Sequence, residues 1–241
     1  FAWGWRVPFL ASALLVFVGL YVRLKLEETP AFQQAIERDE RVRLPMMAVL
    51  TRHGGTLLLG TFSAVATFVV FYLMTVFTLS WGTTTLGYAR KDFLLLQMIG
   101  VLFFALTIPI SAWLADKHGH RTMLMWASLL VMIFGLTFQP LFATGSQSLV
   151  LLFLCLGLGL MGLTYGPIGT SLSSLFPTAV RYTGASLAFN LAGILGGSFA
   201  PYIAKYLGDH YGVQYVGYYL SGAGWVTFLA LWRLGVRRTT I

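Results

Sequence analysis

Long apolar stretches alternate with short polar ones along almost the whole of this chain. Seven of the apolar stretches are long enough to cross a hydrocarbon core of about 30 Å as helices. Helices are the expected spanning element, because lipid offers a bare backbone no hydrogen-bond partner. The pattern therefore predicts an all-α polytopic membrane protein with seven transmembrane helices. The predicted helices cover residues 7–26, 56–79, 93–115, 123–142, 149–172, 185–207 and 215–234.

Four polar side chains within these predicted helices are candidate substrate contacts, namely Tyr72, Gln97, Tyr165 and Asn190. Several of them share a helix face with small or polar residues three or four positions away. Such a face has two interpretations: helix packing through small residues and polar cross-links, or the lining of a wet cavity. A buried amide needs several hydrogen-bond partners, so Gln97 and Asn190 favour the cavity, while packing remains the alternative for each residue.

The predicted helix at 149–172 carries a ridge that is almost free of side chains. Close packing against another helix is the first interpretation of this ridge. A bendable gating helix is the second, because glycine and the nearby Pro167 weaken the backbone ladder. The ridge consists of Cys155, Gly159, Gly162, Gly166 and Gly169.

Composition supports a membrane location. The chain has 241 residues, of which 57% are hydrophobic and 10% are charged, whereas a soluble domain carries about 25% charged residues. The net charge of +8 would suggest a nucleic-acid partner in a soluble protein. Here the basic residues lie between apolar stretches, so we expect a lipid bilayer and no nucleic acid around the chain.

The distribution of basic residues predicts the orientation. Alternate connections share a side of the membrane, and one set holds twelve of the sixteen Lys and Arg residues. The other set holds Arg6, Arg90, Lys91 and Lys205. Because cytoplasmic loops carry an excess of Lys and Arg, we expect the 27–52 connection and the C-terminus to be cytoplasmic.

Reactive groups are scarce in the predicted spans. All eight acidic residues lie at span ends or in connections, so no carboxylate is expected at bilayer depth, where proton relays usually have one. The four histidines lack metal-ligand spacing and Cys155 is the single cysteine. We therefore expect no catalytic residue, no metal and no cofactor. A seven-helix receptor or retinal protein, or an integral membrane enzyme, would need groups that the sequence does not display, and both remain weaker alternatives to a transporter.

The connection after the predicted helix at 93–115 contains Asp116, Lys117, Gly119 and Arg121. Its pattern resembles the loop signature of the major facilitator superfamily, glycine-x-x-x-Asp-Arg/Lys-x-Gly-x-Arg/Lys, with Ala112 at the first glycine. Asp116 can pair with a basic group or stabilise a helix N-terminus. The resemblance implies that this loop, with Arg181, forms a cytoplasmic gate, and a solvated turn is the alternative.

Three further stretches resemble the metabolite–proton symporters of that superfamily. Residues 3–9 read Trp-Gly-Trp-Arg-Val-Pro-Phe, residues 28–32 read Glu-Thr-Pro-Ala-Phe, and residues 175–184 contain Leu-Phe-Pro-Thr followed by Arg181 and Gly184. They occur in the family's order along the whole chain. The family usually has a glutamate where this chain has Ser174, so Arg181 is expected to lack a carboxylate nearby.

The resemblance implies that the predicted helices correspond to helices six to twelve of a longer transporter. Residues 1–26 would form the sixth helix, 27–52 a cytoplasmic connection between bundles, and 53–241 the C-terminal six-helix bundle. The chain would then begin partway through a larger protein, whose N-terminal half holds the coupling acid. The implied function is secondary transport of a small organic acid or zwitterion with protons, by alternating access in the bacterial inner membrane.

Overall fold

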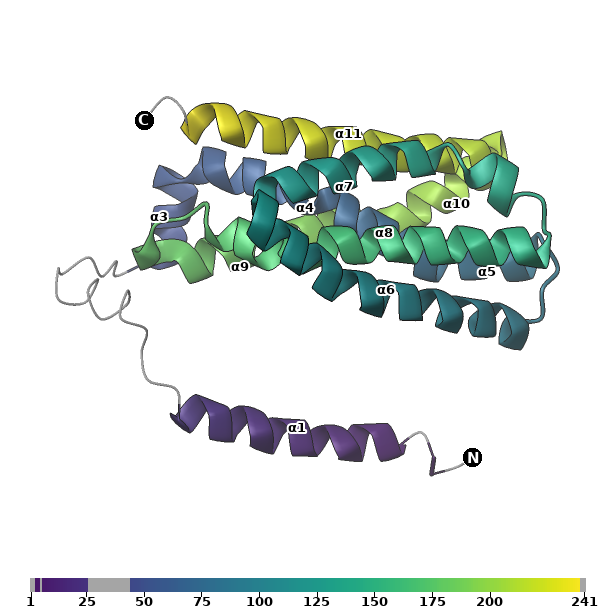
Figure 1. The fold of residues 1–241 in the computed structure, drawn as a ribbon, viewed down its shortest axis with the longest axis horizontal. Coiled ribbons are helices and arrows are strands. Elements are labelled where there is room, and N and C mark those ends of the chain that lie inside the picture. The colour runs from purple at the N-terminus through teal and green to yellow at the C-terminus, as the bar shows by residue number, and fades with distance from the viewer. Residues whose placement is uncertain (1–2, 5, 26–43, 239–241) are drawn as a thin grey trace. The chain divides into compact units, whose positions relative to one another are not determined.

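The computed structural model describes residues 3, 4, 6–25 and 44–238, and every regular element in this part of the chain is helical (Figure 1). Residues 26–43, which include the Glu-Thr-Pro-Ala-Phe motif and most of the predicted 27–52 connection, lie outside the described residues. The chain divides into two units, residues 1–41 and 42–241.

The first unit contains α1 (Arg6–Lys25), an apolar helix of 20 residues that ends with Arg23 and Lys25. Its length suffices for a membrane span.

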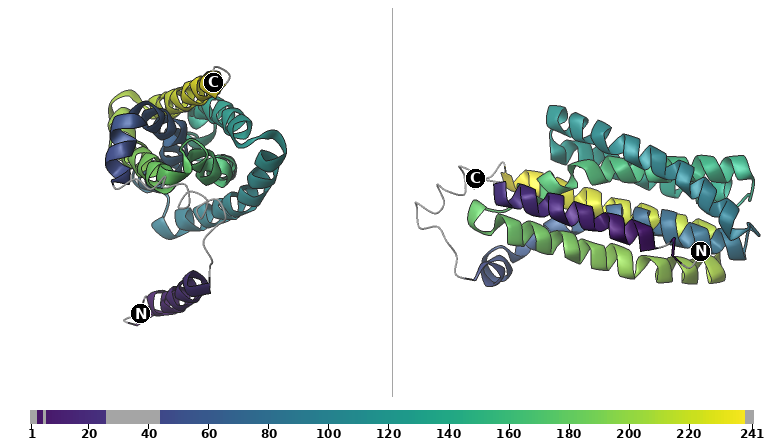
Figure 2. Two further views of the ribbon diagram at one scale, coloured as in Figure 1. Left: turned by 90° about the vertical axis from the view of Figure 1, so that its left-hand side faces the viewer. Right: turned by 90° about the horizontal axis from the view of Figure 1, so that it is seen from below.

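The second unit consists of helices that run side by side as a bundle, which the two views of Figure 2 show. Its elements are α3 (Pro45–Arg52), α4 (Gly54–Tyr72), the π-helical turn η1 (Leu73–Phe77), α5 (Thr78–Thr84), α6 (Arg90–His118), α7 (His120–Gly135), the π-helical turn η2 (Phe138–Phe142), α8 (Gln147–Ser173), the 3-10 turn η3 (Thr178–Val180), α9 (Arg181–Gly193), the π-helical turn η4 (Ile194–Ser198), α10 (Ala200–Tyr211) and α11 (Val213–Arg238).

Within this bundle, α8 packs along α6 and α7, α11 packs along α7 and α4, and α4 packs along α9. The larger apolar core includes stacked or edge-to-face phenylalanine rings from α7, η2 and α8, among them Phe134, Phe138 and Phe153. A smaller core joins α3 to α8 and α9 around Val49, Leu172 and Ala188.

Three glycines of the predicted ridge on α8, Gly159, Gly162 and Gly166, face α6, whereas a Cβ added to Gly169 would meet nothing within 4 Å. A Cβ on Gly162 would overlap the Thr107 hydroxyl, and one on Gly166 would overlap the Ser111 hydroxyl. Thr107 donates to the carbonyl of Gly159 (2.9 Å) and Ser111 to that of Gly162 (3.0 Å). These contacts agree with the packing interpretation of the ridge. Neither α6 nor α8 is interrupted at its internal proline.

Fewer spans meet the criteria of length and apolar character among the described residues than the seven that the sequence pattern predicts. Five helical segments among the described residues are both long and apolar enough to cross a membrane, so the chain is a helical membrane protein. They are Arg6–Lys25, Gly54–Thr84, Arg90–His118, Gln147–Ser173 and Thr178–Tyr211. The predicted span at 123–142 is divided into α7, of 16 residues, and η2.

Residues 45–52, the last part of the predicted 27–52 connection, form the helix α3. Pro45 begins α3, where its fixed φ suits the first turn of a helix. Val49 is fully buried in the smaller core.

Candidate functional site

Two neighbouring cavities lie beside α4 and share the side chains of Phe68, Tyr72 and Phe189. The first, of about 410 Å³, is here called the aromatic cavity. The second, of about 260 Å³, is called the amide cavity. Besides the shared residues, the aromatic cavity is lined by Thr67, Phe71, Phe104, Ile108, Met161 and Tyr165, and the amide cavity by Asn190, Gly193, Ile194 and Ser198.

Three of the four predicted substrate contacts meet at these cavities. Tyr72, the last residue of α4, lines both. Tyr165 comes from α8, and its ring lies edge-on to Phe104 of α6 with 5.8 Å between centroids. Asn190 is exposed on α9, and its amide nitrogen donates to the carbonyl of Ser186 (2.8 Å). The helical spacing therefore brings two hydroxyl groups and one amide to one side of the bundle.

Gln97 does not line either cavity. Its side chain on α6 is 8% exposed, and Nε2 donates to the backbone carbonyls of Met74 (2.8 Å) and Thr75 (3.0 Å). It also donates to the hydroxyl of Thr78 (3.3 Å). Of the two interpretations that the sequence left open, these contacts match the polar cross-link between helices.

The described residues that line the two cavities carry no Asp, Glu, Lys, Arg or His. The walls offer aromatic faces, which bind apolar groups, rings or cations, together with a few hydroxyl and amide groups that can orient a ligand by hydrogen bonds. Among the described residues, no group of three or more His, Cys, Asp or Glu side chains is placed to hold a metal ion.

Two of the predicted gate residues, Gly119 and Arg121, lie at one end of the bundle and line a third cavity, of about 260 Å³. Gly119, at φ 91°, makes the turn between α6 and α7 in a backbone conformation that favours glycine. Arg121 then reaches α11, where Nε donates to the carbonyl of Leu231 (2.7 Å) and an Nη to that of Trp232 (3.3 Å). The cavity is lined by Gly119, His120, Arg121, Ser171, Ser174, Leu175, Leu231 and Leu234.

The other gate residues do not meet at that cavity. The side chain of Asp116 is 78% exposed, and its Oδ1 lies 3.9 Å from Nε2 of His120. Lys117 lies over the ring of Trp113, 5.6 Å from its centroid. Arg181 donates through Nε to the carbonyl of Phe176 (3.3 Å). Within this group, Arg121 is therefore the residue that bonds to another helix, α11, while the Asp116 side chain is exposed.

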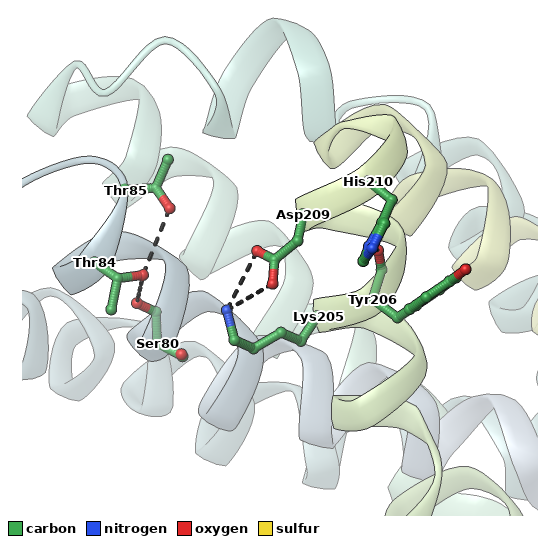
Figure 3. Close-up of polar contacts among 7 residues, drawn as sticks. All are labelled: Ser80, Thr84, Thr85, Lys205, Tyr206, Asp209 and His210. Atoms are coloured by element: carbon green, nitrogen blue, oxygen red, sulfur yellow. Dashed lines mark hydrogen bonds and ion pairs between the residues drawn. The ribbon is translucent and has the colours of Figure 1, made fainter.

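The opposite end of the bundle carries a second polar group, on α5 and α10 (Figure 3). Lys205 and Asp209 form an ion pair one helical turn apart, with Nζ to Oδ2 at 2.9 Å. Tyr206 stacks on His210 with 4.3 Å between ring centroids. Lys205 also borders a small cavity of about 110 Å³ with Ser80 and Trp81. The sequence analysis had considered Lys205 only for its charge, as one of the four basic residues in the less basic set of connections.

Phe189 is a lining residue that sequence reasoning missed. It lies beside Asn190, which drew attention as an amide, and its ring packs edge-on to Phe68 with 5.0 Å between centroids. A phenylalanine in an apolar stretch gives no sign of whether it faces lipid, a core or a cavity. The residue could therefore be found only from the packing.

The family model of the Major Facilitator Superfamily matches residues 1–201 and, in a second match, residues 95–240. The chain is 45% identical over 235 residues to the inner membrane metabolite transport protein YhjE of Escherichia coli (strain K12), covering 95% of this chain and 53% of that protein. It is 29% identical over 230 residues to the citrate-proton symporter of Klebsiella pneumoniae, covering 95% and 50%.

A putative metabolite transport protein of Haemophilus influenzae (strain ATCC 51907 / DSM 11121 / KW20 / Rd) is 40% identical over 241 residues, covering 95% of this chain and 54% of that protein. The chain thus spans about half the length of these curated relatives. No solved structure matches it.

Proposed function

Because the chain belongs to the Major Facilitator Superfamily, we propose that it forms one half of a secondary transporter that moves a small metabolite across the bacterial inner membrane. The observation that carries this proposal is the pair of cavities beside α4, where Tyr72, Tyr165 and Asn190 converge. In this mechanism the substrate binds between this bundle and a second one, and the two rock to expose it to either side.

The proposed substrate is a small organic acid or a zwitterion, moved together with protons. Relatives named as a citrate-proton symporter, a shikimate transporter and a proline/betaine transporter support this range. The cavities contribute aromatic faces and hydrogen bonds. Because the described lining residues are uncharged, we assign the partner of a substrate carboxylate and the proton-coupling acid to the other half of the transporter.

The proposed topology has seven spans, with residues 1–26 as the first, 27–52 as a cytoplasmic connection and 53–241 as a six-helix bundle. One cavity supports this topology, because it is lined by the turn between α6 and α7, the end of α8 and the end of α11. We propose that this end, which carries Lys117, Arg121 and Arg181, is cytoplasmic, as the distribution of basic residues indicates.

Cysteine labelling tests the topology. In a Cys155→Ala background, His118→Cys and Ser146→Cys place single thiols at opposite ends of the bundle, and both positions are exposed. We expect a membrane-impermeant reagent applied to spheroplasts to label position 146 and not 118. Labelling of 118 alone would reverse the topology.

Asp116, Lys117, Gly119, Arg121 and Arg181 are proposed as the cytoplasmic gate group. Arg121 carries the interhelical part of this proposal through its bonds to α11. The exposed Asp116 carboxylate is available to the second bundle when the gate closes. Asp116→Asn should therefore slow uptake by the complete transporter while substrate binding is retained. Unchanged uptake kinetics would favour the alternative interpretation, in which this loop is a solvated turn without a role in gating.

Uptake of labelled metabolites tests the function itself. The complete transporter, in proteoliposomes with an imposed pH gradient, should accumulate at least one organic acid or zwitterion from a panel. Tyr165→Phe removes a cavity hydroxyl and should raise KM about fivefold, the loss of a hydrogen bond of about 1 kcal/mol. Tyr202→Phe is the matched control, because Tyr202 is exposed and outside both cavities. Equal kinetics for the two variants would contradict the assigned site.

A further inference from the structure

The helical segment that carries Tyr72 changes its hydrogen-bonding pattern directly after that residue. In η1 the bonds run from residue i to i+5, and the amide of Thr78 bonds to the carbonyl of Leu73. A π turn contains an extra residue compared with a regular helix and leaves backbone groups that need other partners. It lies between α4, which borders the aromatic and amide cavities, and α5, which borders the small cavity beside Lys205.

Gln97 supplies partners to this turn from a different helix. Its Nε2 faces the carbonyl oxygens of Met74 and Thr75, at 2.8 and 3.0 Å. Because both acceptors are carbonyl oxygens, the NH₂ end of the amide is the one that must face them. The hydroxyl of Thr78 accepts a third contact and itself donates to Met74 (2.6 Å). All three contacts hold residues in or next to η1.

The state of this turn determines how the two helix halves are oriented. Successive residues of an α-helix are rotated by about 100°. If η1 became a regular α-helix, α5 would turn by about that angle relative to α4, and different side chains would face α10. At present Trp81 of α5 is the residue that Gly208 of α10 packs against. A side chain that stabilises the π form of η1 therefore determines which residues of α5 contact α10. It also determines how α5 is rotated relative to α4, which carries Tyr72.

We propose that Gln97 is a positioning residue that holds η1 in its π form, and so fixes the rotation of α5 relative to the half-helix that presents Tyr72. This deepens the proposed transport function and rests on it for its consequence in uptake. The positioning itself does not depend on any substrate. Gln97 is the only polar side chain of α6 in the described structure that donates to η1.

The test measures the thiol labelling rates of two single-cysteine variants on α5, in the absence of substrate. Thr84 is exposed and Thr83 is half-buried. In the complete transporter with Cys155→Ala, we expect Thr84→Cys to react with an aqueous thiol reagent faster than Thr83→Cys. Gln97→Met keeps the size of the side chain and removes its donors. Loss of two hydrogen bonds at their usual net strength should lower the ratio of the two labelling rates about thirtyfold.

The matched control is Gln139→Met, because Gln139 lies in the π turn η2 and is exposed. The second variant is Gln97→Asn, whose shorter amide should lower the ratio less than Gln97→Met does. An unchanged ratio in both Gln97 variants, or an equal fall in Gln139→Met, would overturn the proposal. So would loss of folded protein in both Gln97 variants, since Gln97 would then serve stability alone. A transporter that labels as expected but takes up no metabolite contradicts the proposed function and leaves the positioning role standing.

Discussion

Two pairs of helices in the bundle are built on opposite principles. The α6–α8 pair is close-packed and each helix is continuous, although each contains a proline. The other pair is α4 and α9, which border both cavities, whereas α6 and α8 line only the aromatic one. Each helix of this pair is interrupted, by η1 between α4 and α5 and by η4 between α9 and α10. Small residues serve both pairs, but glycines in α8 bring two backbones together, while Gly197 in η4 accommodates the ring of Tyr72.

The difference indicates which part of the bundle can change shape. In the α6–α8 pair, hydroxyl groups of Thr107 and Ser111 bond across the interface to backbone carbonyls. That interface leaves little room for sliding. Around the cavities, π turns replace part of the regular ladder, and such turns are frequent at functional sites. We therefore expect α6 and α8 to act as a rigid support and the two interrupted helices to adjust around a substrate.

The largest effect should come from filling the ridge in the rigid pair. Gly162→Ala places a Cβ where the Thr107 side chain lies, and 2.6 Å from the carbonyl oxygen of Phe104. Overpacking of this kind usually costs about 1–3 kcal/mol. We expect a lower denaturation temperature in detergent, measured by the loss of monodisperse protein on heating.

Gly169→Ala is the matched control for that variant. Gly169 lies on the same helix, and an added Cβ meets nothing within 4 Å. Replacing a helical glycine by alanine without a clash stabilises by about 0.5–1 kcal/mol. The two variants should therefore shift the denaturation temperature in opposite directions, and an equal fall in both would show that the ridge is not the close-packed part of the bundle.

An intermediate effect is expected on the adjustable side. Gly197→Ala places a Cβ 2.5 Å from Cε2 of Tyr72, so the ring must leave its present rotamer at a cost of about 0.5–1.5 kcal/mol. Because Tyr72 lines both cavities, we expect KM for uptake to rise several-fold while the denaturation temperature changes little. In the control Gly222→Ala, on α11 and outside the lining of both cavities, an added Cβ meets nothing within 4 Å, so KM should not change. If Gly197→Ala lowered the denaturation temperature without changing KM, Gly197 would serve helix packing and not the substrate site.

The contrast between the two pairs could be predicted from the sequence in part. Glycines at helical spacing predicted the ridge of α8, with close packing as the first interpretation and a bendable gating helix as the second. Asn190 and Tyr72 were predicted as site residues from polar positions three or four apart, and both line the amide cavity. These features follow from residue type and helical period alone.

The π turns could not be predicted in this way. A π turn depends on partners from other helices, and Gln97 shows why: its position on a polar face favoured a cavity, yet its acceptors are the carbonyls of a turn 22 and 23 residues earlier. Local periodicity does not contain that pairing. The helices of the structure also extend beyond the apolar stretches from which they were predicted. For example, α6 runs from Arg90 to His118, whereas the predicted helix covered residues 93–115.

The smallest effect should come from the connection at the end of the rigid pair. Tyr88 follows α5 in the chain, and its hydroxyl donates to the carbonyl of Gly145 (2.7 Å), in the turn before α8. Burial raises the pKa of the Tyr88 phenol above its ordinary value. Tyr88→Phe removes one hydrogen bond, so we expect a loss of stability of about 1 kcal/mol.

The pH dependence of that loss distinguishes the hydrogen bond from simple packing. Below the ordinary phenol pKa of about 10, Tyr88 is protonated in both the folded and the unfolded chain, and its contribution is fully present. Above that pH the unfolded chain releases the proton first, because the folded-state pKa is raised, so the contribution falls as pH rises. The difference in denaturation temperature between the unchanged protein and Tyr88→Phe should therefore be constant near neutral pH and shrink above pH ~10. A difference that stays constant into the alkaline range would mean that the phenylalanine variant loses packing and no hydrogen bond to Gly145.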